Sequence, residues 1–362
     1  MTQSANWHTA HVYYYSPDRS GLLLDAMEPL LYEIRDNVNA AYVVPHWRRG
    51  PHLRVTVSAS ADAWTRHVRP AIDRGIGGYL EQHPSRNRLD PDAAIPMHRH
   101  LAALEEEDGP LTPWIPDNTV TYPNFVSRAN QMGGIPIEEL VTDFYVDSNP
   151  FFLKTVRHMK DSNRPTDLTG LLLLLTTAEA IGGMRRNAGS FRSHAEGFLS
   201  DCADPAAARA VFDRQYALHR ATIADLMTAM VATLNGTAAT PLPLVTDWAA
   251  ILRQCIERAE PTVRSGVLGL SEDARQSFLA HPTFPDYLRR AFQNESYLKN
   301  IMGSTDFHRY RMVLALSYLQ LTRMGIPPRA RYLLCHLAAN AIEEHHGFSA
   351  IGWLNEYLDT HA

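Results

Sequence analysis

The sequence lacks several features that mark familiar protein classes. It has 3 cysteines in 362 residues, and they lie far apart with no CxxC pair, which is typical of reduced thiols. It has no GxGxxG, Walker, HExxH or GxSxG motif. The sequence therefore lacks the motifs that would indicate a nucleotide, zinc or hydrolase site. It has no apolar run long enough to span a bilayer and no signal peptide. We therefore expect a cytoplasmic protein without membrane contact.

The overall composition is that of an ordinary globular protein. Hydrophobic residues make up 45% of the chain and charged residues 20%, which excludes a disordered or collagen-like chain. The formal net charge of -5 argues against a protein that binds nucleic acid by neutralising its phosphates. The length allows one large domain or two of ordinary size.

The first part of the chain, residues 1–83, alternates between strand and helix patterns. The hydrophobic periodicity predicts strands over 10–16, 40–47 and 52–58 and helices over 22–35 and 61–80. The order β-α-β-β-α predicts a small sheet that contains antiparallel strands, with helices on one face.

The rest of the chain is irregular at first and then helical. Residues 84–135 are rich in proline and poor in periodicity, so we expect a long surface excursion with one short helix near 97–107. Residues 136–362 are expected to be mostly helical. The predicted helices span 138–147, 151–161, 167–182, 191–199, 205–234, 245–260, 284–302, 307–324, 328–344 and 348–359. The fold class is therefore α+β.

One predicted strand combines an apolar face with a polar face. His52, Arg54 and Thr56 alternate with three apolar residues over 52–57. An exposed edge strand would explain this pattern without any function. The functional alternative is a groove on a rigid strand that holds an anion or a peptide.

A second polar patch precedes the predicted helix at 307–324. Thr305 or Asp306 can cap that helix, and Ser304 then lies just before it, where backbone N–H groups and the macrodipole favour a developing negative charge. Tyr310 follows about one turn into the helix. The alternatives are that Ser304 only caps the helix and that Tyr310 is a half-buried core residue.

The histidine-rich segments do not form a convincing metal site. His336 and Asn340 are one helical turn apart, with Glu343 and Glu344 a further turn on. Asparagine is a poor ligand for zinc, and capping or surface roles account for these residues. We expect no metal.

Three segments in this order resemble a known superfamily. The pattern of His52 and Arg54 resembles the HxRxR strand of lantibiotic dehydratase elimination domains and of their relatives in thiopeptide biosynthesis. Residues 143–148 and 331–340 look like later sequence blocks of the same superfamily. Thr56 and Ala341 stand where elimination domains usually carry arginine. The helix from 307 and the Gly-Ile-Pro-Pro turn after it look more like the stand-alone pyridine synthases. The resemblance covers essentially the whole chain and implies the fold of the elimination domain.

The resemblance implies an enzyme that acts on a dehydrated, azole-bearing precursor peptide. Pyridine synthases join two dehydroalanines in a formal aza-four-plus-two cycloaddition and then release water and the leader peptide, without a cofactor. Hydrogen-bond donors are needed near the reacting amide, and Ser304 and Tyr310 are our candidates. His336 is our candidate for acid–base catalysis of the eliminations.

The remaining site predictions concern binding. Arg54, His52 and Asn340 are expected to bind the substrate. Arg48 and Arg49 would complement an acidic leader near an edge strand at 13–15 or 52–57. The alternatives are the glutamate-eliminating component of a split dehydratase and a non-catalytic partner that binds the precursor. The sequence leaves open whether the protein is a monomer or a homodimer.

Overall fold

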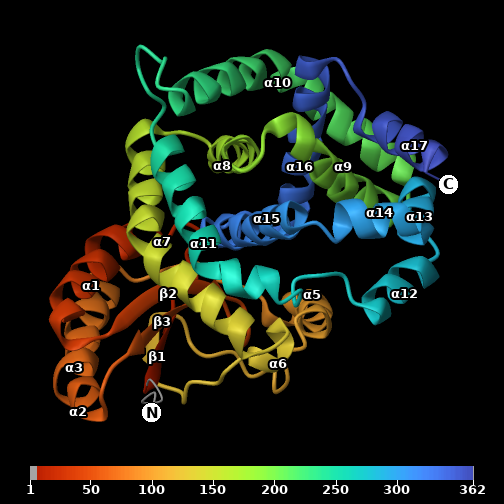
Figure 1. Cartoon of the computed structure of the whole chain (residues 1–362). Helices are drawn as coiled ribbons and strands as arrows, with labels where there is room; N and C mark the ends of the chain where they lie inside the picture. Colours follow the sequence, from red (N-terminus) through yellow and green to blue (C-terminus); the bar gives the residue numbers. More distant parts are fainter. Residues whose placement is uncertain (1–5, 362) are drawn as a thin grey trace. The chain divides into compact units, whose positions relative to one another are not determined.

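The computed structural model describes residues 6–361 and divides into two compact units, with the boundary after Asn163. The first unit holds the sheet, and the second, which begins at Arg164, is helical (Figure 1). The sequence placed the start of the helical part at residue 136. The difference arises because the long helix α7 (Ile135–Ser162) packs against strand β2 (Ala40–His46) and so belongs to the first unit.

The first unit is built on a four-stranded antiparallel sheet. Its other strands are β1 (Trp7–Tyr13), β3 (His52–Ser58) and β4 (Thr119–Thr121), and the strand order is β2-β3-β1-β4. The expectation of an edge strand at 13–15 or 52–57 is wrong, because β1 and β3 are the two central strands and β2 and β4 form the edges. The sequence missed β4, which is too short to show a period.

Helical segments pack beside this sheet. They are a π-helical turn (Leu22–Met27), α1 (Glu28–Ile34), a 3-10 turn (Arg35–Asn37), α2 (Ala61–Ala63), a π turn (Trp64–Val68), α3 (Arg69–Ile72), a π turn (Asp73–Gly77), α4 (Gly78–Gln82), α5 (Pro91–Leu104), α6 (Ala129–Met132) and α7. The runs predicted at 22–35 and 61–80 are therefore helical throughout. Helix α7 continues through Pro150, where the sequence suggested a break. Phe144, Phe151 and Phe152 are buried on either side of it, and their packing outweighs the lost hydrogen bond.

The second unit is a helical array around one buried helix. Its elements are α8 (Thr166–Ala180), α9 (Met184–Ser200), α10 (Pro205–Leu234), α11 (Val245–Arg264), α12 (Glu272–Ala280), α13 (Asp286–Gln293), α14 (Glu295–Tyr297), a π turn (Leu298–Met302), α15 (Thr305–Arg323), α16 (Pro328–His346) and α17 (Ala350–Thr360). Figure 1 shows α8 end-on, with α10, α11, α15 and α16 around it. Leu171 to Leu175 are at most 2% exposed, which fits a helix that is apolar on all sides.

The fold class predicted from the sequence, α+β with a small antiparallel sheet followed by a mostly helical part, is confirmed. Two further differences from the sequence expectations lie in the second unit. The sequence missed α12, and the helix expected at 284–302 is broken at Asn294, whose side chain accepts a hydrogen bond from the backbone N–H of Tyr297 at 2.8 Å and caps α14. Within the described residues, no helix is both long and apolar enough to cross a membrane.

Candidate functional site

A cavity of about 1160 Å³ lies within the second unit. Residues of α9, α15 and α17 line it, together with the segment that runs from α12 to the π turn before α15. Two of the three residues predicted to be catalytic, Ser304 and Tyr310, are among its lining residues. The cavity therefore contains both candidate residues of the polar patch that the sequence indicated before the helix predicted at 307–324.

Ser304 is the N-cap of α15. Its Oγ accepts a hydrogen bond from the backbone N–H of Phe307 at 3.2 Å and donates one to the carbonyl of Ile301 at 2.8 Å. The prediction that Thr305 or Asp306 caps this helix is wrong, because the extended backbone of Ser304 places its own side chain in the capping position. The Ser304 hydroxyl thus stands at the positive end of the α15 dipole and lines the cavity.

Tyr310 is a buried phenol with an unused hydroxyl. It is 3% exposed, and its hydroxyl oxygen has no hydrogen-bond partner among the described residues. Burial raises the pKa of Tyr310 well above its ordinary value, so the group stays protonated. A buried donor without a partner is costly, and Tyr310 is among the residues that line the cavity, so a ligand bound there could accept its hydrogen bond.

A histidine that the sequence analysis did not select also lines the cavity. His194 Nδ1 lies 2.5 Å from the hydroxyl of Tyr318, which in turn lies 3.2 Å from the Sγ of the buried Cys335. His194 is accessible from the cavity. Removal from bulk water, and then the charge of Arg331, lower its pKa to about 4. The imidazole is therefore neutral at pH 7 and can accept a proton.

A sequence signal for this face of α9 did exist. Gly189, Ser193 and Gly197 recur every four residues and, like His194, line the cavity. Small residues at that spacing on an otherwise ordinary helix leave room for a ligand on one face. The signal was missed because none of these residues has a charge or a recognisable motif around it.

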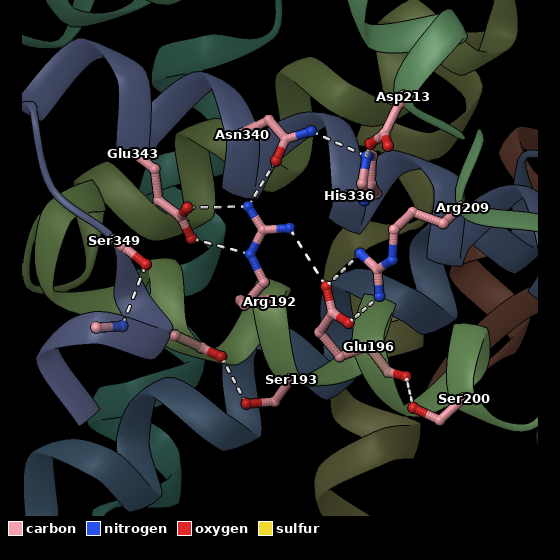
Figure 2. A network of polar contacts seen from close by, with 12 residues as sticks. Arg192, Ser193, Glu196, Ser200, Arg209, Asp213, His336, Asn340, Glu343 and Ser349 are labelled. Atoms are coloured by element: carbon pink, nitrogen blue, oxygen red, sulfur yellow. Dashed lines mark hydrogen bonds and ion pairs between the residues drawn. The ribbon is translucent and has the colours of Figure 1, made fainter. Parts of the chain in front are cut away.

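His336 and Asn340 lie in a polar network rather than among the residues that line the cavity (Figure 2). His336 is 1% exposed, and its Nε2 lies 2.9 Å from both Asp213 Oδ1 and Asn340 Nδ2. Burial, and then the charge of Arg192, lower the pKa of His336. Asn340 lines a second, shallower depression of about 710 Å³, together with Asp213.

Arg192 connects this network to the cavity. Figure 2 shows its guanidinium in contact with Asn340 and Glu343, both on α16. Its Nη2 donates to Asn340 Oδ1 at 2.5 Å, and its Nε donates to Glu343 Oε1 at 2.9 Å. Arg192 also lines the cavity and stands two residues before His194 on α9. The network therefore fixes α9, which carries His194, against α16.

His52 and Arg54 belong to the first unit and to the polar face of its sheet. In the register, His52 pairs with Tyr13 and with His46, and Arg54 pairs with His11. The ring of His52 stacks on that of His11, with centroids 4.6 Å apart. His52 Nε2 and Arg54 Nε have no partner among residues 6–361. Burial lowers the pKa of Arg54 to about 10.

Arg48 and Arg49 follow β2 and are both engaged. Arg48 Nη1 lies 2.9 Å from Glu107 Oε2, and Arg49 Nε donates to the carbonyl of Pro113 at 2.9 Å. Possible ligand atoms of His46, Glu105 and Glu107 lie within 4.8 Å of one another, which is close enough for a metal. Glu107 also lies 3.6 Å from the guanidinium of Arg128. Two arginines already neutralise this carboxylate, so we assign no metal to the cluster.

Comparison with known proteins agrees with this architecture. Residues 7–342 match the family model described as lantibiotic biosynthesis dehydratase C-term. The solved structure of the pyridine synthase TbtD from thiomuracin biosynthesis has 32% sequence identity and a TM-score of 0.77, and the match covers 94% of this chain and 99% of that one.

A second solved structure, TsrL, shares the fold at 19% identity, with a TM-score of 0.66 and coverage of 96% of this chain and 97% of that one. No curated protein sequence matches the chain. The family model spans most of the chain and the match to TbtD exceeds 30% identity over nearly the full length of both proteins. The chain therefore belongs to the family of lantibiotic dehydratase C-terminal domains, and the pyridine synthase TbtD from thiomuracin biosynthesis is one of its relatives.

Proposed function

We propose that this protein is a pyridine synthase that acts on a dehydrated precursor peptide in thiopeptide biosynthesis. The observation that carries the proposal is that Ser304 and Tyr310, two residues with hydroxyl side chains, line one cavity in a chain that is 32% identical to a pyridine synthase. The volume of about 1160 Å³ exceeds that of most small-molecule pockets, and a peptide segment could occupy it.

The reaction needs an amide to act as part of a diene. One dehydroalanine and the iminol form of its neighbouring amide make a two-aza-diene, and a second dehydroalanine supplies the alkene that closes the six-membered ring. Holding the two alkenes in reach of each other removes most of the entropic cost of this step. The Tyr310 hydroxyl, which has no other described partner, donates to the amide oxygen as it gains iminol character, and Ser304 adds a second donor.

The ring then loses water and the leader peptide, the latter as an amide, to become a pyridine. Each elimination moves a proton from a ring position to a leaving group. We assign this proton transfer to His194, because its imidazole is neutral and accessible from the cavity. His336, which was our candidate from the sequence, holds the network behind α9 and positions His194 through Arg192.

Substrate recognition outside the cavity involves the first unit. We propose that Arg49, with Arg48, attracts an acidic leader, which must compete with the contacts of these side chains to Pro113 and Glu107. Arg54 and His52 retain a buried Nε and Nε2 without a described partner. We propose that a bound peptide satisfies these buried polar atoms on β3, which is the substrate-binding role expected from the sequence.

Mass spectrometry of one reaction tests the function. The protein is incubated with a dehydrated, azole-bearing precursor, and a pyridine synthase gives a product that has lost water and a released leader that ends in an amide. A glutamate-eliminating enzyme would change only a glutamylated precursor and release glutamate. A binding protein would change no mass. Either of these last two results contradicts the proposal.

A further inference from the structure

One wall of the cavity is aromatic. Phe278 on α12 stacks on Phe284, with ring centroids 5.6 Å apart and planes at 25°. Phe292 on α13 meets Phe278 edge-on at 5.8 Å and lies 5.3 Å from Phe284. All three rings line the cavity. We call them the aromatic wall.

Phe278 is the member of the aromatic wall with a free surface. Its side chain is 46% exposed, although its ring is stacked on Phe284. Phe284 and Phe292 also pack against a core cluster that contains Leu288 and Leu354, so they have a structural task. Phe278 is not part of that cluster. An apolar ring of this size, partly exposed on a cavity wall, has an open face for a ligand.

The polar groups at this end of the cavity are occupied with one another. Thr283 Oγ1 lies 3.0 Å from Asp201 Oδ1 and 3.1 Å from His281 Nδ1. Arg289 donates to the carbonyls of Leu279 and His281, which fixes the turn between α12 and α13. These contacts hold the aromatic wall in place. The guanidinium of Arg289 also lies over the Phe284 ring, 5.9 Å from its centroid, and donates its hydrogen bonds to backbone carbonyls. A flat, uncharged ligand fits this environment better than a charged one.

We propose that the aromatic wall is a subsite for a planar, uncharged heteroaromatic ring of the peptide, which stacks on Phe278. The inference rests on the proposed function, because the azoles of the modified precursor are the rings of this kind that its substrate would carry. An electron-poor azole stacks favourably on the electron-rich face of a phenyl ring. The subsite would hold the segment next to the reacting alkenes and so contribute to their alignment.

The test measures binding of a defined probe, a leaderless peptide with two thiazoles and no dehydroalanine, by isothermal titration calorimetry. Phe278→Ala removes the ring, and Phe278→Leu keeps an apolar side chain without a π face. Stacking of this kind changes affinity by about two- to tenfold, so we expect Phe278→Leu to bind the probe weaker by that factor and Phe278→Ala weaker still. Leu218→Ala, at an exposed position on α10 outside the cavity lining, is the matched control and should bind as wild type does.

The results separate this inference from the proposed function. Equal affinity of wild type and both Phe278 variants would overturn the subsite, even where the wild type converts the full precursor. So would equal affinity of the wild type for a probe with phenylalanine in place of the thiazoles. A wild type that binds the thiazole probe through Phe278 but converts no precursor would contradict the function and leave the subsite standing. Melting temperatures of the variants exclude loss of folding as the cause.

Discussion

The Tyr318 hydroxyl lies 2.5 Å from Nδ1 of His194 and thereby selects which imidazole nitrogen is left for the cavity. Burial, and then Cys335, raise the pKa of Tyr318 well above its ordinary value, so the phenol remains protonated and able to donate. We assign the phenol proton of Tyr318 to its contact with Cys335 Sγ, so Nδ1–H of His194 donates to the Tyr318 oxygen and Nε2 stays without a hydrogen in the neutral ring. In the proposed mechanism, this arrangement leaves Nε2 able to accept a proton during the eliminations.

The first prediction follows from the low pKa of His194. We expect His194→Asn to slow loss of water and leader more than ring closure, because a proton acceptor in the cavity is removed. In the wild type, the elimination rate should be level from about pH 5.5 to 8 with respect to this group and fall as pH approaches its pKa of about 4. Single-turnover mass spectrometry across pH measures it. Elimination rates in His194→Asn equal to those of wild type would contradict the assignment.

The second prediction distinguishes a role of Tyr310 as a hydrogen-bond donor from a purely structural role. Tyr310→Phe should slow cyclisation about 10²- to 10³-fold, as expected for loss of one preorganised donor. The same change removes a buried hydroxyl that has no described partner, so the melting temperature should stay the same or rise. If Tyr310→Phe lowers activity and the melting temperature together, Tyr310 has a structural role in the hydrophobic core and not a role as a donor.

The third prediction concerns Ser304, whose side chain also caps α15. Ser304→Ala loses both the cap, at about 1 kcal/mol, and the hydroxyl. Ser304→Gly loses the hydroxyl but costs only a few tenths of a kcal/mol at an N-cap, so it should be nearly as stable as wild type and as slow in cyclisation as Ser304→Ala. Leader affinity should be unchanged in both. If Ser304→Gly cyclises the substrate at the wild-type rate, Ser304 serves only as the N-cap of α15.

The fourth prediction decides the role of His336. Because His336 contacts Asp213 and Asn340 and does not line the cavity, His336→Ala should lower stability and slow every chemical step by a similar factor. Chemical denaturation and single-turnover kinetics measure the two effects. Selective accumulation of a cyclised but not yet aromatic intermediate would restore the acid–base role that the sequence suggested.

The fifth prediction uses the buried histidines of the first unit. Burial, and then Arg54, lower the pKa of His11 from 6.5 to about 3, and burial lowers that of His52 as well. Between pH 6.5 and about 3 the unfolded chain binds more protons than the folded one. The contribution of these groups to the free energy of unfolding is therefore fully present above about pH 6.5 and falls as pH decreases towards 3. Each group contributes up to about 1.4 kcal/mol per pH unit.

Urea unfolding from pH 7 to 4.5 measures this slope. His11→Gln cannot gain the charge and should show a shallower fall than wild type, while His361→Gln, at an exposed position near the end of the chain, should not. Parallel curves for wild type and His11→Gln would show that other groups cause the acid sensitivity.

The sequence predicted the parts of this molecule that depend on near neighbours. Ser304 and Tyr310 are joined by one helix, so their shared location follows from the helical period alone. Strand β3 was recognised, but not its central position, because that depends on its pairing with β1, far earlier in the chain, as well as with the neighbouring β2. The cavity was not predictable either, since His194 and Phe278 come from helices that only the tertiary packing brings to one space.

Resemblance to a family did not settle individual roles. His336 and Asn340 lie in the segment 331–340, which resembles a sequence block of the family. A histidine one helical turn from a polar residue suggested acid–base catalysis. In the structure, the pair is held by Asp213 and Arg192. Only the partners on other helices distinguish a residue that supports a site from one that lines it.

The difference in burial between α8 and the segments α12, α14 and the π turn before α15 has a kinetic consequence. Leu171 to Leu175 should have the slowest amide exchange in the second unit, because opening them requires global unfolding. By contrast, α12, α14 and the π turn before α15 contain no buried residue among those described. These segments can therefore open by local fluctuation. We expect the proposed peptide substrate to reach the cavity through these segments on the timescale of such fluctuations, while the packing around α8 remains intact.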